Sequence, residues 1–542
     1  MKRKKHLLLA LAVLLVLSGV FTGCSSKAQE TGKTEVDPDR MLKVAELVNP
    51  STTDVQKNTE YYNVPLNIYD RLVEAETVEP GKSDLVPGLA EKWDISADGL
   101  VYTFHLRKGV KFHNGEELKA DDVLFTFDRM LDPATKALNT DFLDMIAGAK
   151  DRMDGKADSV SGLKVIDDYT IQITLEQPFA PFLANIATPA GSIYNRKATT
   201  AAGEQFGLDP KLTIGTGPFV FDSWTLNDQM ILVANKDYFK GAPKLAGVII
   251  KIVPDAETQR MLFETGELDV FDCDNARSQI PYFEGSEKWK NQMVSGPRVG
   301  LHYYCINEGI KPLEDVRVRK ALQMAIDRET LLEKLFYGKG VLADGIMPIG
   351  LVGHNPELEK ITYDPEKARA LLVEAGYPDG FDMVISQISD RPASLKMNEA
   401  VQSMLGDVGI KAEIRQMDEA SWFATRKEGK LPCYYTDWSA DFNDPDNFMY
   451  TFFYEKNSVA RSFNYINKDV SDRLVGARAM TVPEERYAEY QALEKKIVVE
   501  DAAWIPLFSL DHLFVVQPRV KNFQVSWNGW SSMPYRNITI EP

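Results

Sequence analysis

The sequence predicts an α/β protein with more than one layer and more than one lobe. Strand-like and helix-like patterns are intermixed along the whole chain, which is typical of helices that pack on sheets. The chain has 542 residues, whereas a single hydrophobic core stops growing at about 250–300 residues. We therefore expect at least two lobes.

The N-terminus has the layout of a secretory signal. Residues 2–5 are all basic, and an apolar run follows from Leu7 to Leu17. This run is shorter than the roughly 20 residues that span a bilayer, so a cleaved signal is favoured over a retained anchor. The residues before Cys24 resemble a bacterial lipoprotein processing box, which would remove residues 1–23 and place acyl chains on Cys24. The alternative is an ordinary signal peptide with an unrelated cysteine.

Residues 24–40 are polar and without apolar periodicity, so we expect a flexible spacer there. The formal net charge of −17 argues against nucleic acid as a partner. Cys273, Cys305 and Cys433 allow at most one disulfide, and their spacing does not predict a structural zinc site.

Local patterns predict individual strands and helices. Apolar residues alternate over 100–106 and 171–175, as in half-buried strands. Capping residues and apolar faces predict helices at residues 121–131 and 256–265, after Asp315, after Asp327, and at 398–408 and 483–499.

Several ordered motifs resemble family 5 of bacterial extracellular solute-binding proteins, which includes dipeptide-, oligopeptide- and nickel-binding components of importers. The sharpest motifs lie at residues 85–93, 112–123, 215–219, 235–239 and 316–327. The general resemblance extends over essentially the whole mature chain.

The resemblance implies a two-lobed, periplasmic-binding-protein-like fold of the large peptide-binding type II class. A large lobe would comprise residues 41–298 and 508–542, with a subdomain at about 62–185, and a second lobe residues 299–507. Closure would hinge on two crossing strands.

One segment, residues 438–448, is similar to the place where peptide-binding relatives hold an acidic anchor. The matching residue is Asp441, which would pair with the α-amino group of the ligand, because a buried ammonium needs a charged acceptor. Trp438 would form an apolar wall beside it. The alternative makes Asp441, Asp444 and Asn447 turn-forming and capping residues.

Arg391 is the candidate partner for a ligand carboxylate, because a guanidinium can bind both oxygens. Its position resembles the place where dipeptide-binding relatives hold the peptide C-terminus, although Ala393, Ser394 and Leu395 depart from the residues often found there. A solvated loop arginine is the alternative. Two anchors at a fixed separation would favour dipeptides.

The sequence lacks the common hydrolase, metalloprotease and phosphate-loop motifs, so we do not expect an enzyme. His113 belongs to a turn motif and is interpreted as structural, and the other histidines of the body are isolated. We expect no metal site and no cofactor.

The resemblance thus implies a monomer, tethered by lipid to the outer face of the cell membrane, that captures short peptides and delivers them to the permease and ATPase subunits of an ABC importer. Alternatives are the binding of a nickel chelate or another non-peptide solute, a surface peptide sensor or chaperone, and an anchored hydrolase.

Overall fold

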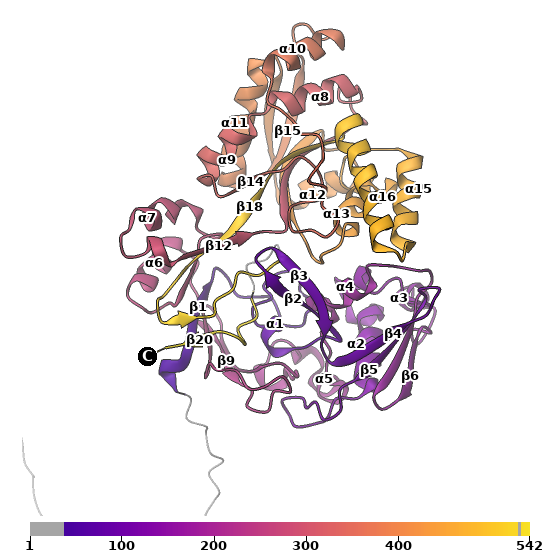
Figure 1. Ribbon diagram of the computed structural model, residues 1–542, viewed down its shortest axis with the longest axis vertical. Coiled ribbons are helices and arrows are strands. Elements are labelled where there is room, and N and C mark those ends of the chain that lie inside the picture. Colours follow the sequence, from indigo (N-terminus) through magenta and orange to yellow (C-terminus); the bar gives the residue numbers. More distant parts are fainter. Residues whose placement is uncertain (1–36, 529–532, 542) are drawn as a thin grey trace, which may run out of the picture. The chain divides into compact units, whose positions relative to one another are not determined.

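The computed structural model describes residues 37–528 and 533–541 (Figure 1). The predicted signal at residues 1–23, Cys24 and most of the predicted spacer lie outside the described residues. In the described part, none of the helices combines the length and apolar character needed to span a bilayer.

The first sheet joins the start of the described chain to its middle. Its strand order is β1 (Met41–Glu46), β10 (Gly247–Ile252), β9 (Gln229–Ala234) and β8 (Phe219–Thr225). β1 is parallel to β10, and the other pairs are antiparallel. The core beside this sheet also contains side chains from the C-terminal part of the chain, such as Phe514.

A second sheet contains both strands that the alternating pattern predicts. It has the antiparallel order β4 (Ala90–Ile95), β5 (Val101–Leu106), β7 (Thr170–Thr174) and β6 (Leu163–Asp167). Helix α2 (Ala120–Leu131) packs into the same core, which confirms the predicted helix at 121–131. A hairpin of β2 (Val73–Glu79) and β3 (Lys82–Pro87) lies nearby in the sequence.

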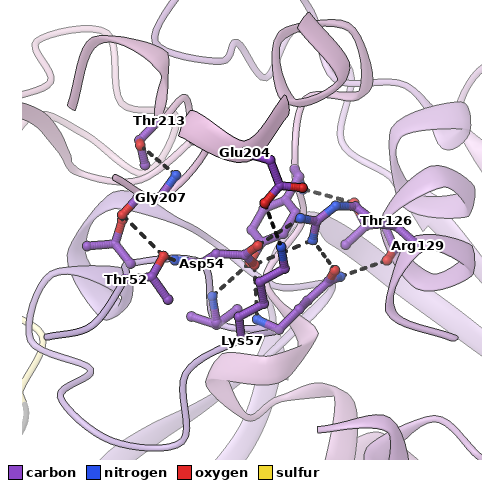
Figure 2. Close-up of polar contacts among 12 residues, drawn as sticks. Thr52, Asp54, Lys57, Thr126, Arg129, Glu204, Gly207 and Thr213 are labelled. Atoms are coloured by element: carbon purple, nitrogen blue, oxygen red, sulfur yellow. Dashed lines mark hydrogen bonds and ion pairs between the residues drawn. The ribbon is translucent and has the colours of Figure 1, made fainter. Parts of the chain in front are cut away.

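A buried ion pair ties α2 to the loop after β1 (Figure 2). Arg129 Nη2 donates to Asp54 Oδ2 at 2.8 Å. The Tyr194 hydroxyl and the backbone N–H of Gln56 donate to Asp54 Oδ1 at 2.9 and 3.1 Å. Because these three donors use both oxygens, this buried carboxylate is fully satisfied.

The third sheet is organised around one long strand, β18 (Trp504–Val516). The first half of β18 pairs with β13 (Gly300–Ile306) and β14 (Gly340–Leu342), and β13 pairs in turn with β17 (Cys433–Ser439). The second half pairs with β12 (Met293–Pro297) and β11 (Val270–Asp272).

The two halves of β18 contribute to different cores. Ile505 and Leu507 pack in a core with the helices that follow β13. Phe514 and Val516 pack beside the first sheet. The chain therefore has more than one core, as its length predicts, and one strand runs from one core to another.

Helices and a parallel strand pair build the region after β13. The strands are β15 (Asp382–Ile388) and β16 (Lys411–Met417), and the helices are α8 (Val316–Ala325), α9 (Arg328–Phe336), α10 (Pro365–Glu374) and α11 (Pro392–Asp407). Asp315 and Asp327 cap α8 and α9, as predicted. The predicted start of α11 at residue 398 is wrong by about two turns, because proline fits the first turn of a helix and the helix begins at Pro392.

A helical region with an aromatic core completes the fold. It comprises α12 (Glu419–Lys427), α13 (Asp446–Phe453), α14 (Glu455–Ala460), α15 (Lys468–Ala479) and α16 (Pro483–Lys495), with a π-helical turn η9 (Lys496–Glu500). α16 and η9 together confirm the predicted helix at 483–499. In the core, Trp504 stacks on Tyr303 with ring centroids 4.0 Å apart.

Short elements connect these regions. Helix α6 (Ala256–Glu264) is capped by Asp255, and Gly266 just beyond it has a left-handed φ of +80°, as the sequence predicts. The remaining helices and strands are α1 (Pro65–Ile68), α3 (Ala149–Met153), α4 (Phe182–Ile186), α5 (Arg196–Ala202), α7 (Ile280–Gly285), β19 (Val520–Lys521) and β20 (Thr539–Ile540). Single 3₁₀ turns lie at Pro38–Arg40, Pro133–Thr135, Thr140–Phe142, Pro189–Gly191, Gly203–Gln205, Pro210–Leu212, Arg277–Gln279 and Lys290–Gln292.

Candidate functional site

The segment between β17 and α13 carries the predicted anchor Asp441. The backbone N–H of Ala440 donates to the carbonyl of Val299 at 2.8 Å, just before β13. At the other end, α13 begins directly after Pro445, whose fixed φ suits a helix start. The segment is therefore held at both ends, close to where β13 and β17 pair.

Asn447 joins Asp441 to Trp438. Its Nδ2 donates to the Asp441 carboxylate at 3.1 Å. Its Oδ1 accepts from the backbone N–H of Asp441 at 3.1 Å and from the Trp438 indole at 3.2 Å. The structure thus brings the predicted anchor and the predicted wall together through one buried amide.

Asp441 borders three cavities, with volumes of about 480, 500 and 630 Å³. Each cavity has walls from residues 46–189 and from residues 423–487. Side chains from distant parts of the sequence therefore surround this one carboxylate, and cavities of this size suit a small ligand.

The Asp441 carboxylate has no strong counter-ion. Among the described residues, no lysine or arginine nitrogen lies within 4.0 Å of it. Burial raises the pKa of Asp441 to about 6, and the nearby Asp141 adds to the increase, whereas the Asn447 hydrogen bond and Arg461 lower the pKa. A partly desolvated carboxylate without a counter-ion is stabilised by a cation that enters the site.

Two other aspartates of the segment are already paired. Both oxygens of Asp444 accept from Arg486, at 2.7 and 2.6 Å. Asp446 lies 3.0 Å from Arg478. The backbone N–H of Asp446 also donates to Asp444 at 2.9 Å, as the alternative interpretation of the segment expects for Asp444, whereas the role of Asp441 stays a prediction.

The indole ring of Trp438 and the guanidinium of Arg461 lie together in the wall of one cavity. The guanidinium of Arg461 lies 4.6 Å from the centroids of both the Trp438 and Phe452 rings. The two rings meet edge to face at 5.4 Å. Trp438 lines two of the three cavities.

Arg391 lies apart from this site. It stands after β15 at the N-cap position of α11, the place that the sequence predicts. Its side chain is 57% exposed and pairs with Glu419 at 2.9 Å. Arg391 is not among the residues that line the three cavities. Its predicted role in binding a carboxylate stays a prediction.

His113 contacts the backbone, and the cysteines of the described chain form no disulfide. His113 Nε2 lies 3.0 Å from the Gly217 carbonyl, and burial lowers its pKa to about 4. Cys273, Cys305 and Cys433 are buried and unpaired. Across residues 37–528 and 533–541, no three His, Cys, Asp or Glu side chains gather in a way that would hold a metal ion.

Sequence reasoning missed several residues of the site. Asp141, Arg426 and Arg461 line the same cavity as Asp441. They come from separate segments without a shared motif, so no local signal in the sequence marks them.

Comparisons with known proteins identify the family. The profile of bacterial extracellular solute-binding proteins, family 5 middle, matches residues 84–459. The chain is 31% identical to heme-binding protein A of Haemophilus influenzae, with 98% of each chain covered. It is 32% identical to the dipeptide-binding protein of Escherichia coli, with 89% of this chain and 91% of that protein covered.

A solved structure confirms the fold. The periplasmic binding protein DppA of Helicobacter pylori, in complex with the peptide STSA, matches 93% of this chain and 98% of its own, with a TM-score of 0.75 and 28% identity. The predicted α/β, two-lobed, type II fold is therefore confirmed. This chain belongs to family 5 of bacterial extracellular solute-binding proteins.

Proposed function

We propose that this protein captures short peptides, with dipeptides favoured, outside the cytoplasm and delivers them to the permease and ATPase subunits of an ABC importer. As a member of family 5 it is a transport binding protein and not an enzyme. The observation that carries the peptide proposal is Asp441, a half-buried carboxylate that lines three cavities and has no close counter-ion among the described residues. An α-ammonium group is the cation that every unmodified peptide supplies.

The relatives support a peptide ligand. One is named a dipeptide-binding protein, and a solved relative of 28% identity holds the peptide STSA. A site that binds the termini and main chain of a peptide does not depend on the peptide's side chains. Many different side chains would then fit into the three cavities.

We further propose that closure of two lobes buries the peptide. The lobes would be residues 41–298 with 508–542, including a subdomain at about 62–185, and residues 299–507. In support, the walls of each cavity come from both predicted lobes. A ligand drives closure only through contacts that are stronger in the closed state, and a desolvated ion pair at Asp441 is such a contact.

Arg391 is the candidate partner for the C-terminal carboxylate of the peptide in this proposal. It would bind the peptide C-terminus by exchanging Glu419, its present partner, for the ligand carboxylate. Because this ion pair is exposed, the exchange would cost little.

The anchor is a separate proposal that rests on the sequence. Removal of residues 1–23 and acylation of Cys24 would tether the protein on the outer face of the cell membrane. We expect a Cys24→Ala substitution to release the protein from the membrane fraction, and intact-mass measurement of the wild type to show acyl chains. Retention of Cys24→Ala in the membrane would contradict the anchor.

The test of the peptide proposal compares a dipeptide with its blocked form by calorimetry. We expect N-acetyl-Ala-Ala to bind at least about 30-fold more weakly than Ala-Ala, because loss of a buried charge partner costs 2 kcal/mol or more. Native mass spectrometry of protein purified without refolding would show co-purified peptides. Equal affinity for both forms would contradict the role of Asp441.

A second candidate is a non-peptide solute, since one relative covering 98% of the chain is named a heme-binding protein. Heme or a metal chelate released from the purified protein, together with no binding of Ala-Ala, would favour this function. Asp441 would then be a wall residue of the site.

A further inference from the structure

The cavity of about 630 Å³ beside Asp441 contains several charged side chains of both signs. They are the aspartates Asp141, Asp144, Asp441 and Asp446 and the basic residues Arg426, Lys427, Arg461 and Arg478. Charges inside a cavity are costly unless they are paired, so the question is which of them have partners in the protein.

The three arginines differ in this respect. Arg478 is neutralised by Asp446 at 3.0 Å. For Arg426 and Arg461, no carboxylate oxygen of the described residues lies within 4.0 Å of the guanidinium. Arg461 donates from Nε to the Thr451 carbonyl at 3.0 Å. The Nε of Arg426 is buried without a partner among the described residues.

Aromatic rings hold both guanidinium groups in place. Arg461 lies over Trp438 and Phe452, as described above. Arg426 lies 4.9 Å from the Phe423 ring centroid and 5.3 Å from that of Trp422. Stacking orients a guanidinium without using its terminal N–H groups. The terminal groups of Arg461 therefore remain for an acceptor that the described chain does not provide.

Two electrostatic relations place this acceptor. Burial lowers the pKa of Arg461, and the neighbouring Arg426 lowers it further, so the two cations repel each other. Asp441 and Arg461 affect each other's pKa and yet do not form an ion pair within 4.0 Å. Asp441 and Arg461 thus line the same cavity without pairing with each other, and this arrangement fits a ligand that carries both an ammonium and a carboxylate.

We infer that Arg461, assisted by Arg426, binds a carboxylate of the same ligand whose α-amino group Asp441 binds. This inference rests on the proposed function. The ligand class is a peptide with a carboxylate a few bonds from its amino group. Two sources have this chemistry, namely the side chain of an acidic first residue and the C-terminus of a dipeptide.

Four peptides distinguish the sources. Glu-Ala and Gln-Ala differ in the side-chain charge, and Ala-Ala and its C-terminal amide differ in the terminal charge. Their affinities are measured by calorimetry for the wild type and for Arg461→Gln, Arg461→Lys, Arg426→Gln and Arg391→Gln. Arg415→Gln is the matched control, because Arg415 is exposed on β16 and pairs with Glu413 away from the cavities.

We expect the wild type to prefer the charged member of at least one pair by about 30-fold, as for other desolvated charge pairs. Arg461→Gln should abolish this preference while the uncharged member binds as before. Arg461→Lys should restore part of the preference, and Arg415→Gln should keep all of it. A purely structural role for Arg461 would weaken all four peptides equally and would overturn the inference.

The other outcomes are also decisive. If the wild type binds the peptides and Arg461→Gln keeps every charge preference, the inference is wrong and the proposed function stands. If only Arg391→Gln removes the C-terminal preference and no side-chain preference exists, the inference is equally wrong. If the wild type binds none of the four peptides, the proposed function itself fails.

Discussion

Two aspartates, the buried Asp54 and the half-buried Asp441, differ in how the protein pairs their carboxylates. Asp54 accepts hydrogen bonds from Arg129, Tyr194 and the backbone of Gln56 (Figure 2). The carboxylate of Asp441 accepts one hydrogen bond from a side chain of the described residues, that of Asn447. Asp54 has a cationic partner within the protein, whereas Asp441 has none within ion-pair distance in the described chain.

We propose that this difference marks the position where the charge of a ligand binds. A buried ion pair that the chain completes by itself fixes two elements, here α2 and the loop after β1. A buried carboxylate that lacks such a pair raises the free energy of the empty protein and lowers it when a cation binds. The first arrangement belongs to the fold, and we propose that the second belongs to function.

The largest expected effect comes from breaking the completed pair. Arg129→Met keeps the apolar stem of the side chain but leaves the Asp54 carboxylate buried without its cation. We expect a loss of about 3–5 kcal/mol in the free energy of unfolding, measured by urea denaturation at pH 7.

Arg415→Met, at an exposed ion pair, is the control and should change stability by no more than about 1 kcal/mol. The fraction of Arg129→Met that remains folded should bind Ala-Ala like the wild type. A stability loss as small as that of the control would show that the Asp54 pair is not structural.

The next effect concerns ligand binding. Asp441→Asn removes the charge and preserves the shape, so we expect Ala-Ala affinity to fall by about 30-fold to 1000-fold, because a desolvated charge pair contributes about 2–4 kcal/mol. Calorimetry measures this change directly.

The matched control is Asp222→Asn, since Asp222 is exposed on β8 and lines none of the three cavities. It should leave affinity unchanged. If Asp441→Asn binds Ala-Ala as tightly as the wild type, Asp441 does not hold the amino group, and the contrast with Asp54 loses its functional meaning.

Much of the fold follows from local signals in the sequence. Capping aspartates such as Asp255 and Asp327 predict helix starts correctly, because the cap hydrogen bond depends on neighbouring residues alone. The apolar pattern alone places the start of α11 too late, because it does not take into account that Pro392 fits the first turn of a helix. The pairing of β18 with strands of two cores depends on contacts between distant segments, which periodicity does not encode.

The candidate site was predictable only in part, for the same physical reason. Asp441 and Trp438 lie in one short segment, so a motif can reveal both. Arg461 and Asp141 reach the cavity from other elements and become neighbours of Asp441 only in the folded chain. The sequence predicts Arg391 as the cation, a role that stays a prediction, and in the structure its exposed side chain at the start of α11 pairs with Glu419.

A smaller effect is the pH dependence of binding. Only the ionised form of Asp441 pairs with an ammonium, and its pKa in the free protein is raised to about 6 by burial. Affinity for Ala-Ala should therefore be almost constant above pH 7 and about tenfold weaker at pH 5, where roughly one carboxylate in ten is ionised.

Asp144 lines the same cavity and also has a pKa raised to about 6, mainly by burial, so a control must separate the two groups. Asp441→Asn should bind weakly with little dependence on pH between 5 and 7, whereas Asp144→Asn should keep the tenfold change. The opposite pattern would assign the pH dependence to Asp144.

The smallest expected effect is a gain in stability from the same substitution that removes binding. The folded-state pKa of Asp441, about 6, lies above its ordinary value of 3.8, so folding favours the protonated form. The penalty for the charged form is therefore absent below about pH 4 and fully present above about pH 6.

Asn resembles the protonated carboxyl, and its oxygen can still accept from Asn447. We expect the free energy of unfolding of ligand-free Asp441→Asn to be about 1 kcal/mol higher than that of the wild type at pH 7.5, and the two values to be equal at pH 4. The expected difference at pH 7.5 is smaller than the full pKa shift implies, because the carboxylate borders cavities. Thermal unfolding at both pH values measures the difference. If Asp441→Asn is the less stable protein at both, the Asp441 carboxylate is a structural group like that of Asp54, and the free energy stored in its burial is not available to a ligand.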